Sequence, residues 1–235
     1  MIKHYPFSQL GKANHGWLKA NHHFSFAHYY NPQRMGFGTL RVVNDDWVQA
    51  GTGFSAHPHQ NMEIITYIRS GEITHQDSVG NKGVTRAGEV QVMSAGSGVV
   101  HSEFNLSREP LTLFQIWINP NQMDVQPRWN AKQFPRELSH QSLPLLVSGY
   151  EEDAETALFI HQQARIFGGR LAKDAKISHE ITHQAYVLAS SGRFKLSVDN
   201  NEVLLHKGDG AEVTNLKNVN ITALEDSEII IIDAP

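Results

Sequence analysis

The chain of 235 residues is long enough for one large all-β domain or for two smaller domains. Hydrophobic residues make up 40% of it and charged residues 19%, which excludes a disordered chain because so much apolar surface must be buried. The net charge is −4, and no cluster of five or more basic residues occurs. We therefore expect no direct binding of nucleic acid, which needs a basic surface.

The chain contains no cysteine, which excludes disulfides, thiolate metal sites and cysteine nucleophiles. The first residues hold no apolar stretch typical of a signal peptide, and no segment approaches the roughly 18–20 apolar residues of a membrane helix. We expect a cytoplasmic protein without membrane contact. The unusual feature of the composition is its 14 histidines, whose positions supply the main functional clue.

Short runs of β-branched and aromatic residues, separated by Gly, Asn, Asp, Ser and Pro, predict strands along most of the chain. Their spacing of about ten residues is typical of a β-sandwich or barrel. Short helices are expected only near Trp129–Phe134 and in the acidic stretch Glu151–Glu155. The expected strands are Gly36–Val43, Met62–Ile68, Glu72–Asp77, Val90–Ser94, Leu111–Asn119, His183–Ala189, Phe194–Val198, Val219–Leu224 and Glu228–Asp233.

Two of these runs carry further expectations. Leu111–Asn119 is apolar on both faces except at Gln115, which predicts a strand covered on both sides. The run Ile229–Ile232 has high β-propensity, so we expect it to be paired inside a sheet, because an open edge of this kind would aggregate.

A domain boundary is expected between residues 120 and 155, where prolines interrupt a polar stretch without strand alternation. We expect an N-terminal domain over residues 1–130, a linker over 131–155 and a C-terminal domain over 156–235.

The two halves also form a faint repeat. The separation of Gly71 from Gly88 is 17 residues and that of Gly192 from Gly208 is 16. A duplicated β-domain would produce this spacing, whereas chance similarity between hairpins is the alternative explanation.

Two pairs of metal-ligand residue types stand about forty residues apart. His57 and His59 form one i, i+2 pair, and His101 and Glu103 form the other. Side chains two residues apart on a strand point to the same face, so each pair can direct both members toward one ion. Imidazole with carboxylate suits Fe, Mn, Ni, Cu or Zn. The alternative, histidines of a surface loop with Pro58 as a turn residue, is disfavoured by the second pair.

Glu63 has the same strand parity as His57 and His59 and would share their face on a regular strand. It could be a ligand in place of Glu103. It could instead accept the N–H of a ligand imidazole and so fix the orientation of that ring. The residues alone leave both roles open.

Parts of these segments fit the two cupin motifs. Gly51, His57, His59 and Glu63 match G-x5-H-x-H-x3,4-E-x6-G, although the final glycine, Gly71, comes one residue late.

The end of the second motif, G-x5-P-x-G-x2-H-x3-N, is matched by Gly98, His101 and Asn105. No proline stands two residues before Gly98, and the spacing from Gly88 is two residues longer than the motif allows.

The whole chain resembles the pirin family, a subgroup with two cupin domains. The resemblance is dense over about residues 14–120, and the C-terminal half matches only in its general β pattern. The segments that carry it are Phe24–Ala27, Gly36–Gly38, Leu40–Val42, Asn44–Asp46, His57–Glu63, His75–Gly80, Ala95–Gly98 and His101–Glu103.

The resemblance implies an all-β bicupin, with two consecutive jelly-roll-like β-barrels packed together and few short helices. It implies one metal site, in the N-terminal barrel, with His57, His59, His101 and Glu103 as ligands. Glu63 then becomes a nearby acceptor that does not bind the metal. One divalent transition metal is implied, Fe(II) first, with Mn, Ni, Cu, Co or Zn as alternatives.

Two functional hypotheses follow from the resemblance. Some bacterial members are similar to quercetin 2,3-dioxygenases, which open a flavonol ring with O2 and release carbon monoxide. The first hypothesis is such a dioxygenase, in which Glu103 also accepts the proton of the aromatic substrate. Other members are described as iron-dependent transcriptional cofactors that contact a DNA-binding protein. The second hypothesis is therefore a non-enzymatic metal-binding protein that regulates a protein partner.

A sugar-phosphate isomerase is less favoured than either, because neither a glycine-rich phosphate cradle nor a Lys/Arg cluster lies near the motifs.

Other histidines are weighed in the same way. For His75 and Asp77 we favour local hydrogen bonding at a strand end over a role in the pocket or as partners that orient a metal ligand. His22 and His23 precede an aromatic pair that is more typical of core than of a pocket mouth. His179 and His183 imitate the first cupin motif but lack a partner pair, so no metal is expected in the C-terminal barrel.

Overall fold

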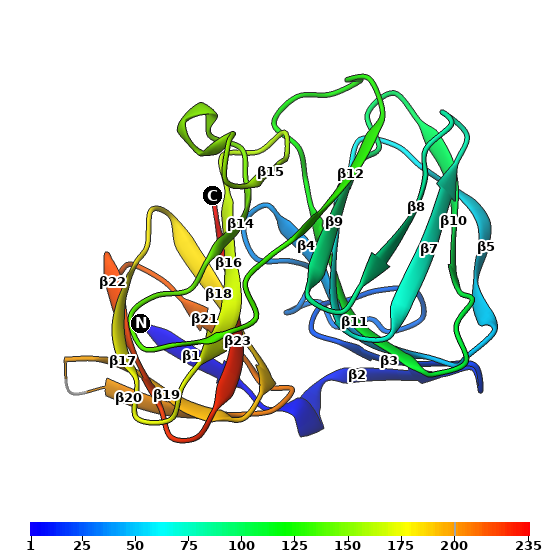
Figure 1. Ribbon diagram of the computed structural model, residues 1–235. Coiled ribbons are helices and arrows are strands. Elements are labelled where there is room, and N and C mark those ends of the chain that lie inside the picture. The colour runs from blue at the N-terminus through cyan, green and yellow to red at the C-terminus, as the bar shows by residue number, and fades with distance from the viewer. Residues whose placement is uncertain (200) are drawn as a thin grey trace. The chain divides into compact units, whose positions relative to one another are not determined.

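Strands account for nearly all regular structure in the computed structural model, which describes residues 1–199 and 201–235 (Figure 1). Within these residues the two helices are single 3-10 turns, η1 (Phe7–Gln9) and η2 (Glu151–Asp153). No helix in this part of the chain is long and apolar enough to cross a membrane. The expected all-β class is confirmed.

Contacts between residues divide the chain into two units. The N-terminal unit comprises Gly11–Phe134 and Leu158–Gln162, and the C-terminal unit comprises Met1–Leu10, Pro135–Ala157 and Gln163–Pro235. Residues 1–10 therefore group with the C-terminal half of the sequence. The domain boundaries expected from the sequence stay a prediction.

The N-terminal unit contains a sheet with the order β12-β9-β6-β11-β4-β3-β2 and a second sheet with the order β5-β10-β7-β8. Each sheet ends in an edge strand on both sides, so neither sheet closes on itself. The two sheets form an open cupin-like sandwich and not the expected closed barrel. The bounds are β2 (Gly11–Asn14), β3 (Leu18–His22), β4 (Leu40–Val48), β5 (Thr52–His59), β6 (Glu63–Ser70), β7 (Glu72–Asp77), β8 (Lys82–Arg86), β9 (Glu89–Ser94), β10 (Val99–Asn105), β11 (Leu111–Ile118), β12 (Arg128–Gln133) and β15 (Leu158–Phe159).

The C-terminal unit repeats this plan. One sheet runs β1-β21-β18-β23-β16-β14, with β13 beside β16, and the other runs β17-β22-β19-β20. The bounds are β1 (Ile2–Tyr5), β13 (Leu138–Ser139), β14 (Leu145–Ser148), β16 (Arg165–Leu171), β17 (Lys176–Glu180), β18 (Gln184–Ser191), β19 (Arg193–Val198), β20 (Asn201–His206), β21 (Gly210–Val213), β22 (Asn218–Ala223) and β23 (Ser227–Ala234).

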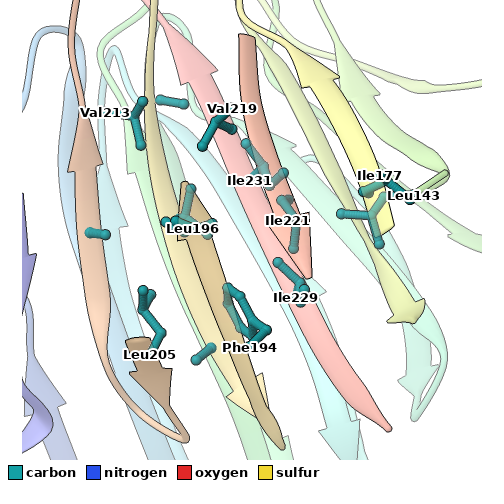
Figure 2. Close-up of a cluster of buried hydrophobic side chains, with 14 of the residues drawn as sticks. Leu143, Ile177, Phe194, Leu196, Leu205, Val213, Val219, Ile221, Ile229 and Ile231 are labelled. Atoms are coloured by element: carbon teal, nitrogen blue, oxygen red, sulfur yellow. The ribbon is translucent and has the colours of Figure 1, made fainter. Parts of the chain in front are cut away.

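The core of the C-terminal unit lies between its two sheets. Figure 2 shows Ile229 and Ile231 of β23 near Phe194 and Leu196 of β19 and Ile221 of β22, and all five are fully buried. Strand β23 pairs with β16 on one side and β18 on the other, which confirms that the isoleucine run is paired inside a sheet.

One expected helix is wrong. The stretch near Trp129–Phe134 forms strand β12, which pairs antiparallel with β9. Pairing with a neighbouring strand outweighs the weak local preference of so short a segment. The acidic stretch does contain a short helix, η2.

Replacing Ile231 by alanine is expected to lower the free energy of unfolding by about 2–5 kcal/mol, because it removes buried methyl groups and leaves a cavity. Leu204, which is 37% exposed on β20, provides the control. Its alanine variant should lose less than about 1 kcal/mol. Urea unfolding followed by circular dichroism measures both, and equal losses would contradict the assigned core.

Candidate metal centre

Strands β5 and β10 pair antiparallel and bring the two expected ligand pairs side by side. His101 lies opposite His57, whereas Glu103 lies opposite Phe54, so a bulge displaces one strand against the other between these positions. Gly53 permits the close approach of the strands, because a Cβ atom there would lie 2.2 Å from the backbone oxygen of Glu103.

Three imidazole rings gather at this pairing. Their centroids are 4.8 Å apart for His57 and His59, 4.5 Å for His57 and His101, and 4.9 Å for His59 and His101. The Nε2 atoms of His57 and His101 are separated by 3.1 Å. Possible ligand atoms of all three residues lie within 4.8 Å of one another, so they can contact one ion.

Neutral imidazole is the form that binds a metal. Burial, with the nearby His57, lowers the pKa of His59 to about 4. Burial, with His57 and His59, lowers the pKa of His101 to about 3. Both rings are therefore neutral at pH 7.

The tautomer of His57 follows from its backbone contact. Its Nδ1 lies 2.7 Å from the carbonyl oxygen of Ser55, which can only accept a hydrogen bond. Nδ1 therefore donates this bond, which leaves Nε2 as the nitrogen of His57 that can bind a metal.

Glu103 is buried beside this cluster and is held by two amides. Its Oε1 accepts a hydrogen bond from Gln91 Nε2 at 2.6 Å, and its Oε2 accepts one from Gln115 Nε2 at 3.2 Å. Burial raises the pKa of Glu103 to about 7, against the opposing effect of the two amide bonds. Its carboxylate also lies within 4.8 Å of ligand atoms of His75 and His101.

His75 connects His101 to Asp77. The expected local hydrogen bond is confirmed, since His75 Nε2 lies 3.0 Å from Asp77 Oδ2. The other ring nitrogen of His75 lies 3.4 Å from His101 Nδ1, and the ring stacks on Trp129 with centroids 5.1 Å apart. These contacts fix the orientation of the His101 ring, as partners of ligand histidines commonly do.

A row of polar side chains crosses the large sheet beneath Glu103. Neighbouring strands place its members directly opposite one another, in the order His22, Asn44, Gln115, Thr66 and Gln91. His22 Nδ1 lies 2.7 Å from Asn44 Oδ1, and Gln91 Nε2 donates to Thr66 Oγ1 at 3.4 Å.

Sequence reasoning missed this row because its five residues come from five strands. The sequence feature that could have indicated the row is Gln115, the polar residue that interrupts the apolar pattern of Leu111–Asn119.

A cavity of about 380 Å³ opens beside the imidazoles. His57, His59 and Glu103 form part of its lining. Its aromatic lining residues are Trp17, Phe26, Phe54 and Trp117. A cavity that combines aromatic walls with converging polar groups is typical of a small-molecule site.

Glu63 occupies a different environment. Its Oε2 accepts a hydrogen bond from Ser94 Oγ at 2.7 Å, and its carboxylate also accepts one from the backbone of His161. Burial raises the pKa of Glu63 to about 7, which these hydrogen bonds and the charge of Arg128 oppose. Neither cluster of candidate ligands in the described residues includes Glu63.

The histidines of the C-terminal unit have other neighbours. His183 Nε2 lies 3.0 Å from Tyr150 Oη, and the His179 ring packs edge-on against Phe167 at 4.6 Å. Clusters of three or more candidate ligands occur, within residues 1–199 and 201–235, only in the N-terminal unit.

Comparison with known proteins supports the resemblance drawn from the motifs. The Pirin family profile matches residues 5–118, and the profile of the quercetinase C-terminal cupin domain matches residues 145–234. A pirin-like protein of Caulobacter vibrioides is 47% identical over 236 residues, covering 100% of both chains. The chain belongs to the pirin family.

A sequence match and a solved structure from Escherichia coli bear on the site of this pirin-family chain. Quercetin 2,3-dioxygenase of strain K12 is 41% identical over 229 residues, which are 97% of this chain and 96% of that protein. The crystal structure of the bacterial pirin YhhW in complex with nickel(II) superposes with a TM-score of 0.92 at 39% identity, covering 100% of this chain and 99% of that one. The two-cupin fold is thereby confirmed.

The donor set fits a divalent transition metal. The candidate ligands form two groups that share His101: His57, His59 and His101 in one, and His75, His101 and Glu103 in the other. Imidazole with carboxylate is a donor set that such ions prefer, and no thiolate is available. The pirin-family chain therefore contains a candidate His/Glu metal site in its N-terminal unit.

The pKa of Glu63 leads to a prediction about stability. Between 4.5, its ordinary pKa, and about 7, the folded protein retains a proton that the unfolded chain has released. Stability therefore falls as pH rises through this window. The Glu63→Gln variant has no carboxyl group to titrate at this position and avoids this loss of stability. Between pH 4.5 and pH 8 its free energy of unfolding should therefore rise by about 1–3 kcal/mol relative to that of the wild type.

Urea unfolding of the metal-free protein at several pH values tests this expectation. Glu151→Gln, at an exposed carboxylate, serves as the control and should follow the wild type. Parallel curves for Glu63→Gln and wild type across the window would show that burial of Glu63 has no such effect.

Proposed function

We propose that this protein is a metal-dependent dioxygenase that cleaves the heterocyclic ring of quercetin or a related flavonol with O2 and releases carbon monoxide. One observation carries the proposal: the imidazoles of His57 and His59 and the buried carboxyl group of Glu103 border a cavity lined by aromatic rings. A flat aromatic molecule fits such a cavity. The name of the Escherichia coli relative supports the same reaction.

In this proposal His57, His59, His101 and Glu103 hold one divalent transition metal. Fe(II) is the first choice, because a site of imidazoles and carboxylate with open positions suits non-haem iron. The nickel complex of the bacterial pirin makes Ni(II) the first alternative to test. The metal, when bound, would supply Lewis acidity that lowers the pKa of a substrate hydroxyl and would support reaction with O2.

In this proposal the protein's side chains accept the substrate proton and orient the substrate. Glu103 lines the cavity, where its carboxylate is placed to accept the proton of the flavonol hydroxyl. Gln91 and Gln115 hold both of its oxygens in place. The rings of Phe26 and Trp117, which meet edge-on at 5.4 Å, offer the substrate a fixed aromatic wall.

Oxygen uptake with quercetin tests the proposal. Protein is loaded anaerobically with Fe(II), Mn(II) or Ni(II) in parallel, and O2 consumption, quercetin loss and carbon monoxide are measured together. The His57→Ala/His59→Ala variant should lose at least about 100-fold in rate, because even outer partners of metal ligands are worth ~10–100-fold.

The control replaces a histidine pair of the C-terminal unit. His179→Ala/His183→Ala should retain the wild-type rate, because neither residue belongs to a candidate ligand cluster. Stoichiometric metal binding without turnover on any of the three metals would reject the flavonol dioxygenase. It would favour the metal-binding regulator of a protein partner.

A further inference from the structure

Asp46 is a buried acid in the wall of the cavity, and the sequence analysis assigned it no role. It lies on β4, two residues beyond Asn44 of the polar row, and therefore points to the same face of the sheet. Its cross-strand neighbours are apolar: Ala20 on β3 and Leu113 on β11. The Asp46 side chain therefore lies beside the polar row but outside it, and the residue is only 3% exposed.

The Asp46 carboxyl lacks the partners that buried acids normally have. Its Oδ1 is sealed from solvent and accepts no hydrogen bond from the described residues. The nearby Arg69 is not its partner, because that guanidinium pairs with the carboxylate of Asp45. Buried polar atoms are rarely left without a partner, and exceptions often mark functional groups.

Three polar groups of the cavity wall near Asp46 already form hydrogen bonds within the protein. Asn44 bonds to His22, Gln115 donates to Glu103, and Trp117 donates to Gln115 at 3.1 Å. Asp46 contrasts with these three residues, because it lines the same cavity and its carboxyl forms no hydrogen bond with the described residues, although its Oδ1 is itself sealed from solvent.

The protonation state of Asp46 fits a bound hydroxyl. Burial, with the charges of Asp45 and Glu103, raises the pKa of Asp46 to about 8, against the attraction of Arg69. The side chain is therefore a neutral carboxylic acid at pH 7 and can both donate and accept a hydrogen bond.

We propose that Asp46 binds a hydroxyl group of the aromatic substrate, other than the hydroxyl directed at the metal ligands. The inference rests on the proposed function for the position of the aromatic molecule in this cavity. It narrows the substrate class to flat aromatics with a second, peripheral hydroxyl. Asp46 then determines specificity, because a site built to hydrogen-bond a hydroxyl rejects an analogue that lacks it.

Binding under argon tests the proposal without turnover. Quenching of tryptophan fluorescence reports occupancy, since Trp17 and Trp117 line the cavity. The probes are quercetin and 3-hydroxyflavone, which retains the 3-hydroxyl and 4-keto groups but lacks the other hydroxyls. The Ni(II)-loaded wild type should bind quercetin at least about tenfold more tightly than 3-hydroxyflavone.

In Asp46→Leu this ratio should fall to about one, through weaker binding of quercetin. Asp46→Asn should keep part of the preference, because an amide still donates and accepts hydrogen bonds. The thermal midpoint of Asp46→Leu should equal or exceed that of the wild type, since the substitution removes a polar group without a partner. A structural role would instead lower the midpoint and leave the ratio unchanged.

Asp45→Asn is the matched control on the same strand. Asp45 faces away from Asp46 and pairs with Arg69, so this variant should lower the midpoint while keeping the wild-type ratio. Three results would overturn the assignment. The affinity ratio could stay unchanged in Asp46→Leu, it could fall equally in Asp45→Asn, or the wild type could bind neither probe.

The outcomes separate this inference from the proposed function. If quercetin is not consumed with any metal but the ratio still depends on Asp46, the dioxygenase is rejected and the binding role of Asp46 stands. If quercetin is consumed and Asp46→Leu keeps the wild-type ratio, the dioxygenase stands and the role of Asp46 is rejected.

Discussion

The register between β5 and β10 controls the candidate site, because side chains alternate between the two faces of a strand. His101 lies opposite His57, so both rings and that of His59 share one face. A slip by one residue would turn His101 away from the others. The bulge beside Glu103 and the bare backbone of Gly53 adapt this pairing to the crowded site.

Burial of acids in an apolar sandwich is the second constraint. The hydrogen bonds differ from acid to acid. Two side-chain amides donate to Glu103, and a serine and a backbone amide donate to Glu63, whereas Asp46 Oδ1 has no partner among the residues that the structure describes. Burial raises the pKa of all three carboxyl groups. A neutral acid that forms no hydrogen bond within the protein suits hydrogen bonding to a ligand.

Local patterns predicted the parts of the site that lie close together in sequence. The i, i+2 spacing of His57 and His59 and of His101 and Glu103 indicated strands with shared faces, which β5 and β10 confirm. Gln91 and Asp46 were not predicted, because their positions depend on the order of β9 and β4 in the sheet. The same non-local pairing made β12 a strand, despite its short helix-like stretch.

X-ray absorption at the edge of the bound metal tests the central claim most directly, that one ion is held by imidazoles of β5 and β10. Stoichiometrically loaded wild type should bind one metal per chain, with imidazole scattering in its first coordination shell. His101→Ala should lose part of that scattering, and His179→Ala should match the wild type. The same spectrum for His101→Ala and wild type at full metal occupancy would contradict the account.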